Sequence, residues 1–435
     1  MRVFRFLDAR YEAGEARLVY AFDGGPELTE SLRFPGAPAV PPERAEAFER
    51  ALALTHWIAG VSYYKAFAPA RIECATAPPD PAVAAALERI YVEGLAEFSF
   101  RNGIDLRGRV RFPSAQGSGP RPSLSLPRRT LLPLGGGKDS LVALEMLREV
   151  GEPLLPVWVG RSALIEACAE RAGLPAINVD RQIAPELFEL NRQGALNGHV
   201  PVTAIHSAIM VLVALLYGAD AIAFANERSA DLPTRVIEGR GVNHQWSKSL
   251  DFERLFRTML GGWIGAGIEY FSLLRPFSEL AVAARFSRMR RYFDVFSSCN
   301  RNFRILGTRP ASRWCGECPK CHFVYLAMAP FLPKPELAAV FGRNLLDEES
   351  LIPAYAALAG IAGERPFECV GEPVEVRAAL AALAEQAAWR EDAVIAAARR
   401  WLERLPPPPS LGELLRPSGP HHLPSRLESL LDAPH

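Results

Sequence analysis

Apolar and polar residues alternate through residues 2–34, with breaks at Gly14 and at Gly24-Gly25. This period-two pattern predicts a small antiparallel sheet. Helical patterns follow at about residues 43–58 and 81–97. Because strands are followed by helices without regular alternation, the pattern predicts an α+β domain at the start of the chain.

From residue 129 onward the pattern changes to short apolar strands that alternate with helices. The predicted strands are residues 130–134, 154–160, 176–180 and 221–225. Such a succession is typical of an α/β domain whose parallel sheet is covered on both faces. Ligands of such sheets bind beyond the carboxyl ends of the strands.

The last hundred residues have a mostly helical pattern, with a long Ala-rich stretch at 374–405 before four prolines. We interpret this region as a helical cover rather than a separate activity. The predicted organisation has four parts: an N-terminal α+β domain at 1–113, a linker rich in chain breakers at 114–127, a central parallel-sheet domain at 128–333, and a mostly helical C-terminal region at 334–435.

Composition narrows the range of partners. The 49 basic residues balance 49 acidic ones, so no positive field attracts nucleic acid. The longest apolar stretch, 204–219, is shorter than the roughly 18 residues of a membrane span and contains His206. The first residues lack the apolar core of a signal peptide. We therefore expect a cytoplasmic protein with no nucleic-acid, membrane or obligate protein partner.

The strongest chemical signal is the segment Gly135-Gly136-Gly137-Lys138-Asp139-Ser140, which follows an apolar strand and opens a periodic helix. Three glycines allow backbone amides to approach an anion, and the helix N-terminus adds its positive end. The spacing differs from the Walker loop and from the dinucleotide fingerprint. A phosphate-binding loop is predicted, and a glycine-rich turn without a ligand is the alternative.

Four of the seven cysteines are crowded together: Cys299, Cys315, Cys318 and Cys321. This spacing fits a tetrahedral site for a structural Zn²⁺. The alternatives are an iron-sulfur cluster, buried free thiols, or a catalytic thiol of lowered pKa, as in the paired cysteines of cofactor-independent glutamate racemases.

Polar residues near the predicted strand ends are the candidates for catalysis: His199, Glu227, His244 and Lys248. Glu227 directly follows the strand at 221–225, although a helix cap is an equal alternative. For His244 and Lys248 the alternative is an exposed loop. His199 is favoured over His206, which lies on an apolar helix. Arg275 and Glu279 are expected either to hold phosphates and Mg²⁺ or to form an i,i+4 surface pair.

The loop at 135–140 resembles the PP-loop of ATP pyrophosphatases, a HUP-like fold, usually written Ser-Gly-Gly-x-Asp-Ser. The resemblance implies cleavage of ATP to AMP and pyrophosphate with Mg²⁺, Asp139 being a metal ligand and Ser140 a phosphate donor. Gly135 stands where the family has its first serine, and the charge of Lys138 is expected to compensate for that hydroxyl.

Several further segments are similar to those of the MurL family, the UDP-N-acetylmuramoyl-L-alanyl-L-glutamate epimerases. They are residues 59–66, 135–140, 197–203, 226–229, 242–249, 275–280 and the cysteine segment ending at Cys321. The resemblance implies ATP-dependent inversion of the terminal L-glutamate of a UDP-sugar dipeptide through an acyl-adenylate, in peptidoglycan precursor synthesis. By fold analogy, the N-terminal domain with Tyr63-Tyr64-Lys65 is a candidate for holding the sugar nucleotide.

Two other functions remain open from the sequence. The PP-loop enzyme that forms the nitrile of a deazaguanine base also carries a four-cysteine zinc site. A nucleotide-binding module without catalysis is the second alternative, and it is disfavoured because Lys138, Asp139 and Ser140 supply the groups for bond cleavage.

Overall fold

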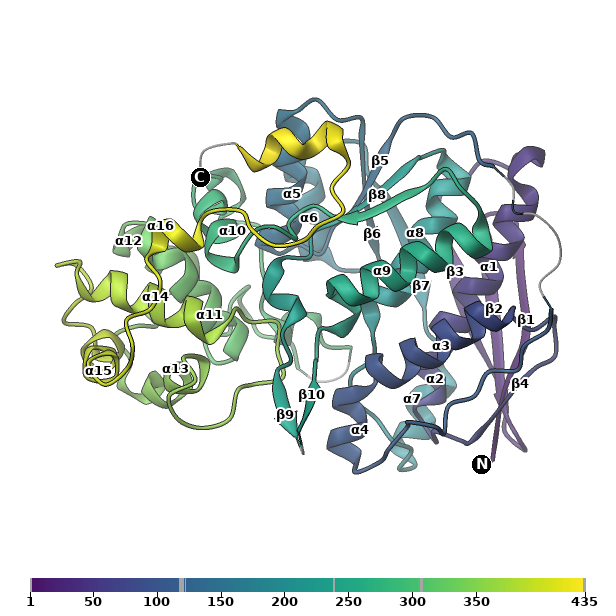
Figure 1. Ribbon diagram of the computed structural model, residues 1–435, viewed down its shortest axis with the longest axis horizontal. Helices are drawn as coiled ribbons and strands as arrows, with labels where there is room; N and C mark the ends of the chain where they lie inside the picture. Colours follow the sequence, from purple (N-terminus) through teal and green to yellow (C-terminus); the bar gives the residue numbers. More distant parts are fainter. Residues whose placement is uncertain (1, 117–120, 122, 238, 306–307, 433–435) are drawn as a thin grey trace.

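One mixed sheet of nine strands organises the protein in this computed structural model, which describes residues 2–116, 121, 123–237, 239–305 and 308–432. The strand order is β11-β8-β5-β6-β7-β3-β2-β1-β4 (Figure 1). A separate two-stranded hairpin projects near the middle of the molecule, formed by β9 (Arg235–Ile237) and β10 (Arg240–Val242).

Five strands of the central domain are parallel to one another, the four that were predicted and β11, which was not. They are β5 (Thr130–Pro133), β6 (Leu154–Val159), β7 (Ile177–Gln182), β8 (Ala221–Phe224) and β11 (Glu269–Ser272). Strand β5 lies between β6 and β8, so the order of the strands reverses at β5. Crevices beyond the carboxyl ends of strands at such a reversal are where open α/β sheets bind ligands.

The predicted N-terminal antiparallel strands also form. They are β1 (Val3–Glu12), β2 (Glu15–Phe22) and β3 (Glu27–Arg33), with β4 (Arg71–Cys74) added in parallel beside β1. Strand β3 pairs with β7, so these strands continue the central sheet. The four-part division of the chain stays a prediction, and residues 117–120 and 122 of the predicted linker lie outside the described residues.

Two hydrophobic cores flank the sheet because neighbouring residues of a strand point to opposite faces. In β5, Leu131 belongs to one core and Leu132 to the other. The first core lies beneath α1 (Ala45–Ala59), α3 (Pro81–Gly94), α8 (Val202–Tyr217) and α9 (Leu250–Met259). The second lies beneath α5 (Lys138–Glu149), α6 (Ala163–Ala172) and α10 (Glu279–Phe286).

The second core extends into a group of helices that lies opposite the β1–β4 edge in Figure 1. Its members are α11 (Pro319–Met328), α12 (Lys334–Phe341), α13 (Ile352–Leu358), α14 (Pro373–Ala384) and α15 (Ala393–Leu402). The prediction of one long helical stretch at 374–405 is therefore wrong, because the region forms two helices. The chain turns between α14 and α15 around Trp389, whose side chain is buried, and the two helices pack on each other.

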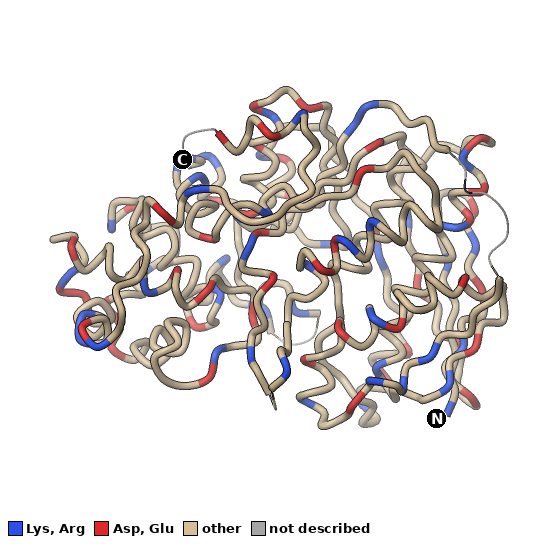
Figure 2. Tube along the Cα trace, viewed as in Figure 1, with Lys and Arg blue, Asp and Glu red and all other residues tan. Residues whose placement is uncertain are grey.

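The remaining helices are short. They are α2 (Val61–Tyr64), α4 (Ala96–Asn102), α7 (Pro185–Arg192) and α16 (Leu411–Leu414). After α16 the chain crosses back over the sheet domain, where Ser418 N donates to Pro276 O at 2.8 Å. Basic and acidic residues are interspersed along the whole trace (Figure 2), in keeping with the balanced charge. Within the described residues, the helices are too short or too polar to cross a bilayer.

Candidate active site

The predicted phosphate loop joins β5 to α5 at the point where the strand order reverses. Gly136 has φ +73°, a conformation that favours glycine. A Cβ added at Gly137 would lie 2.7 Å from Ser298 Oγ, whereas one added at Gly135 would have no described heavy atom within 4 Å. The loop is thus held tightly at Gly137 and opens to space at Gly135, next to the N-terminus of α5.

Two side chains of this loop point inward. Ser140 Oγ accepts from Gly135 N at 3.2 Å and donates to Gly137 O at 3.2 Å, which fixes the turn. Lys138 is completely buried and pairs with Asp139 and Glu279. The expectation that Lys138 compensates for the missing serine hydroxyl thus finds no support in its position, because its ammonium faces two carboxylates instead of the open side of the loop.

Asp139 borders a cluster of carboxylates that the sequence only partly predicted. Glu227, Glu279 and Glu375 are nearly inaccessible, while Asp139 keeps 27% of its side chain exposed. Burial, followed by the charges of Glu279 and Glu375, raises the pKa of Glu227 to about 8. Burial is also the main cause that raises the pKa of Glu375 to about 7. The carboxylates of this cluster therefore act on one another through their charges.

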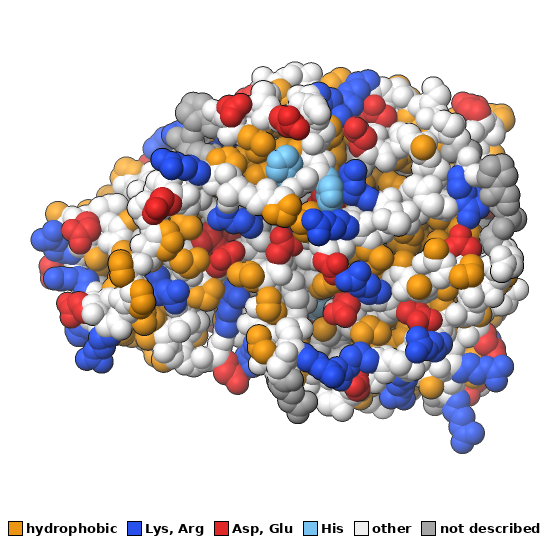
Figure 3. Space-filling view, viewed as in Figure 1, with side chains coloured by type: hydrophobic (Ala, Val, Ile, Leu, Met, Phe, Trp, Pro, Cys, Tyr) orange, Lys and Arg blue, Asp and Glu red, His pale blue; other side chains and the backbone are white. Residues whose placement is uncertain are grey.

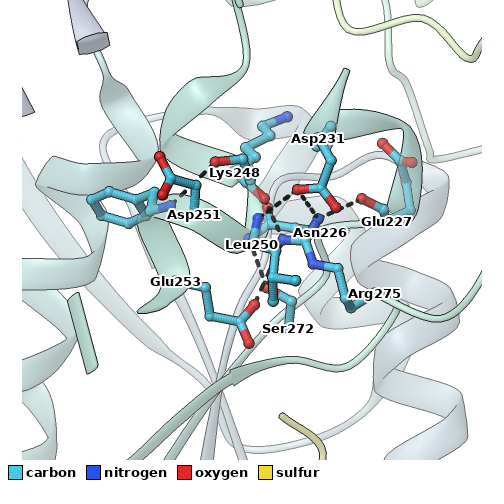
Figure 4. Close-up of polar contacts among 12 residues, drawn as sticks. Asn226, Glu227, Asp231, Lys248, Leu250, Asp251, Glu253, Ser272 and Arg275 are labelled. Atoms are coloured by element: carbon cyan, nitrogen blue, oxygen red, sulfur yellow. Dashed lines mark hydrogen bonds and ion pairs between the residues drawn. The ribbon is translucent and has the colours of Figure 1, made fainter. Parts of the chain in front are cut away.

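Arg275 connects the segments that carry Glu227 and Lys248 (Figure 4). Its guanidinium donates to the carbonyl of Glu227 at 2.9 Å and to the carbonyl of Lys248. It also lies 3.6 Å from Glu253 Oε2. Arg275 is only 1% exposed, so the predicted surface pair with Glu279 is wrong. Burial makes Arg275 a positioning residue for the strand-end loops, and Glu279 pairs with Lys138.

Glu227 is a helix cap, one of its predicted alternatives. It is the N-cap of the 3₁₀ helix Arg228–Asp231, and its carboxylate accepts from Ser229 N. A chemical role for the residue stays a prediction.

His199 and His244 come together from different parts of the chain. Their rings lie 4.3 Å apart, centroid to centroid, and His244 Nδ1 contacts Glu97 of α4 directly. Burial, then the charge of His244, lowers the pKa of His199 to about 3. Burial would lower the pKa of His244 too, but hydrogen bonds to Cys369 and Glu97 raise it to about 9. At neutral pH, His199 is therefore neutral and His244 is an imidazolium.

Lys248 and Cys369 complete this group. Lys248 Nζ lies 3.4 Å from Cys369 Sγ. The negative charge of Cys369 is the main cause that raises the pKa of Lys248, and Asp139 and Glu227 add to it. The ammonium therefore lies between the thiol group and the acidic cluster, which joins the two parts of the site.

The four crowded cysteines form one cluster, as predicted. Their sulfurs all lie within 4.8 Å of one another, and three of the pairs are 3.5, 3.7 and 3.9 Å apart. A tetrahedral zinc with Zn–S bonds of about 2.3 Å requires sulfurs about 3.8 Å apart. Backbone amides of Glu317 and Cys318 point at Cys315 Sγ at 3.4 and 3.3 Å. These distances fit a closed, structural tetrathiolate site.

The cysteine cluster also touches the phosphate loop. Ser297 N, two residues before Cys299, donates to Gly136 O at 3.0 Å. Lys320, beside Cys321, reaches Glu279 at 3.6 Å. The segments held by the cysteines therefore support both the loop and the acidic cluster.

The structure brings the predicted residues into one region, but three members escaped prediction: Glu97, Cys369 and Glu375. Glu97 sits in an ordinary amphipathic helix, and the other two lie in the region interpreted as a cover. No local motif marks them. Conversely, Tyr63 and Tyr64 are buried in the core, with their hydroxyls bonded to Glu30 and to Pro69 O; that the N-terminal domain holds the sugar nucleotide stays a prediction.

A cavity of about 440 Å³ opens beside this region, between α3–α4 and the β9–β10 hairpin. Glu93 and Ala96 line one side, and Arg240 and Val242 line the other. Two residues of the lining, Ala96 and Val242, are close in sequence to Glu97 and His244. Figure 3 shows acidic and basic side chains mixed over this face of the molecule.

Comparison with known proteins gives consistent results over almost the whole chain. The family model of the MurL N-terminal domain matches residues 1–273, and that of the MurL C-terminal domain matches residues 295–408. A UDP-N-acetyl-alpha-D-muramoyl-L-alanyl-L-glutamate epimerase of Xanthomonas oryzae pv. oryzae is 52% identical over 90% of this chain and 88% of its own length. Proteins of the same name from Salinispora tropica and a Micromonospora species are 44% and 43% identical, over 91% and 94% of this chain and 88% and 93% of their own lengths.

Proposed function

The chain belongs to the MurL family, and we propose from this that it inverts the terminal glutamyl centre of UDP-MurNAc-L-Ala-L-Glu, an isomerase reaction. The identity of 43–52% to relatives named for this activity, over nearly the full length of each chain, is the observation that carries the proposal. The substrate is accordingly a UDP-sugar dipeptide.

We further propose that ATP binds at the loop of residues 135–140, as in PP-loop enzymes of HUP-like fold. Three features support this role: the loop lies at the reversal of strand order, Gly135 faces open space, and α5 begins at Lys138. Backbone amides at such a helix start bind phosphate. The Ser140 hydroxyl holds the turn that presents those amides.

The carboxylates beside the loop fit Mg²⁺, which takes a few carboxylate oxygens together with phosphate oxygens. Asp139 is the most exposed of the group and is the carboxylate that would hold the ion. Mg²⁺ would supply positive charge to the departing pyrophosphate. Lys138 pairs with Asp139 and Glu279 beneath the loop.

In this proposal ATP serves to activate the carboxylate. The α-proton of a glutamyl residue with a free carboxylate is a weak acid, because removing it places a second negative charge beside the first. When the carboxylate attacks the α-phosphate of ATP and pyrophosphate leaves, the acyl-adenylate carries an α-proton that a base can remove. Hydrolysis then releases AMP and the inverted product.

The remaining part of the substrate requires room beside the reacting carbon. The cavity of about 440 Å³ is of the size that binds small molecules. Its walls lead to Glu97 and His244, and Arg240 lines it. We place the sugar-nucleotide portion in this cavity, with the diphosphate toward the arginine side chains.

The cysteine cluster fits a structural Zn²⁺ by its sulfur spacing. Its four thiolates leave no open position for a substrate. The ion would hold the segment of Ser297 against Gly136 and so support the phosphate loop.

The test is incubation with UDP-MurNAc-L-Ala-L-Glu, ATP and Mg²⁺ in deuterated water without ammonia. We expect AMP, pyrophosphate and D-glutamyl product with deuterium at the α-carbon. Asp139→Asn should lose AMP formation, whereas the matched variant Asp294→Asn, at an exposed carboxylate paired with Arg171, should keep it. Wild-type protein that forms neither AMP nor deuterated product would refute the proposal.

A further inference from the structure

Charged groups from two other segments lie around the thiol of Cys369. Cys369 lies in the loop between α13 and α14. Lys248 Nζ is 3.4 Å from its sulfur, and the nearby His244 imidazole acts on the sulfur through its charge. On the other side of the imidazole, Nδ1 contacts the Glu97 carboxylate.

The contact between Glu97 and His244 affects the charge of the imidazole. A carboxylate on Nδ1 holds the ring in one tautomer and stabilises its positive form. Glu97 thus holds the His244 imidazole, whose positive charge acts on the Cys369 thiol, and Lys248 provides a second cation beside the sulfur.

The charges favour the thiolate. Burial would raise the pKa of Cys369, but the charge of Lys248 and the hydrogen bond from His244 lower it to about 6. Burial instead raises the pKa of Cys74 to about 11 and that of Cys168 to about 12. A cysteine that only fills space resembles those two residues, whereas a thiolate between cations is a reactive group.

The position of this thiolate suits a reaction on a carboxylate activated at the phosphate loop. Lys248 lies between Cys369 and the acidic cluster, close enough to Asp139 and Glu227 for their charges to act on it. The cavity proposed for the sugar nucleotide is lined by Ala96 and Val242, which are close in sequence to Glu97 and His244. The α-carbon of a substrate that spans from the loop to the cavity would therefore pass this group.

We propose that the Cys369 thiolate removes the α-proton from one epimer of the activated glutamyl residue, with Glu97, His244 and Lys248 as positioning residues. This inference rests on the proposed epimerase function. The C–H bond breaks, its electron pair enters the enolate of the acyl group, and an S–H bond forms. A different group protonates the opposite face. In the reverse direction the Cys369 thiol donates its proton to the enolate.

The test compares both epimers in deuterated water with ATP and Mg²⁺. The variants are Cys369→Ser and Cys369→Ala in the full chain, and Cys74→Ser is the matched control because Cys74 is a half-buried thiol in β4, outside the site. AMP release and deuterium at the α-carbon are measured separately for UDP-MurNAc-L-Ala-L-Glu and its D-glutamyl epimer. A general base contributes about 10²–10⁴-fold to such a step.

In both Cys369 variants, we expect AMP release to persist and net epimerisation to fall by about 10²–10⁴-fold. Deuterium exchange should be lost from one epimer only, because the other is deprotonated by the opposite group. Equal loss of exchange from both epimers together with loss of AMP release would assign Cys369 a structural role. Unchanged exchange would exclude it from the reaction.

Two further results separate the alternatives. Mass spectrometry of the quenched wild-type enzyme tests for a thioester on Cys369, and finding one would overturn the base role in favour of nucleophilic attack. Wild-type protein that releases no AMP would instead refute the proposed function itself. The variant His244→Gln keeps a side chain that can form hydrogen bonds but loses the imidazolium charge. We therefore expect it to slow exchange from the same epimer.

Discussion

The buried ion pair of Lys138 and Glu279 offers a test of the site that requires no substrate. The Lys138 side chain is 0% exposed and that of Glu279 is 2% exposed. Lys138→Met would leave the Glu279 carboxylate buried beside Asp139, Glu227 and Glu375. Removing one partner of a buried pair costs about 3–5 kcal/mol. Lys320 remains 3.6 Å from Glu279, so we expect the lower end, about 3 kcal/mol.

The second variant tests the cause of that loss. In Lys138→Met/Glu279→Leu both charges are replaced by apolar groups, a change that is often neutral or stabilising. We expect the double variant to recover to within about 1 kcal/mol of the wild type. Arg290→Met is the control, because it breaks the pair with Glu336 at the surface, where such pairs contribute about 0–1 kcal/mol.

The assay is urea unfolding followed by circular dichroism, in which a shifted midpoint at unchanged slope measures stability. A double variant less stable than Lys138→Met alone would refute this reasoning.

Three other predictions follow from single contacts. Gly137→Ala should lower the free energy of unfolding by about 1–3 kcal/mol, since its Cβ would lie 2.7 Å from Ser298 Oγ. Gly135→Ser should leave the melting temperature unchanged, because its Cβ would meet open space. Thermal unfolding of both variants tests this difference, and equal melting temperatures would contradict it. Cys318→Ser should abolish stoichiometric zinc in elemental analysis and weaken ATP binding, and purified wild type without bound metal would contradict the assigned site. Burial is the main cause that lowers the pKa of His56 to about 4. The neutral ring therefore contributes roughly 3 kcal/mol of stability that is present above about pH 6.5 and is lost as pH falls through about 4. In His56→Gln the free energy of unfolding should depend less on pH in that window, and an unchanged slope would exclude His56 as the cause.

The sequence predicted the parts of the site that depend on local order. The loop at 135–140 is one continuous segment between a strand and a helix, so its residue types and their spacing describe its conformation. The cysteine cluster was predictable for the same reason, because three of its members fall within seven residues. The parallel strands were found within one or two residues at each end, since short apolar runs between helical segments are typical of buried strands.

The contacts of the Lys138 side chain could not be predicted from the loop at 135–140 alone. Its charge suggested contact with a phosphate, but the direction of its side chain depends on Glu279, 141 residues later. Likewise, Arg275 and Glu279 are spaced as a helical pair, yet the helix α10 begins only at Glu279. Arg275 therefore lies outside the helix and turns toward the carbonyls of Glu227 and Lys248.

The C-terminal region shows why the proton-transfer group was missed. Its apolar residues pack into the second core, as the interpretation of a helical cover requires. The same packing places α14 against the sheet domain, so that Glu375 accepts from Leu280 N at 3.3 Å and the preceding loop brings Cys369 to Lys248. A single cysteine in a polar loop carries no periodic signal, and its reactivity arises only from charges that other segments supply. The packing of α13 and α14 on the sheet domain therefore has two effects: it covers the second core, and it brings the Cys369 thiol beside its cations.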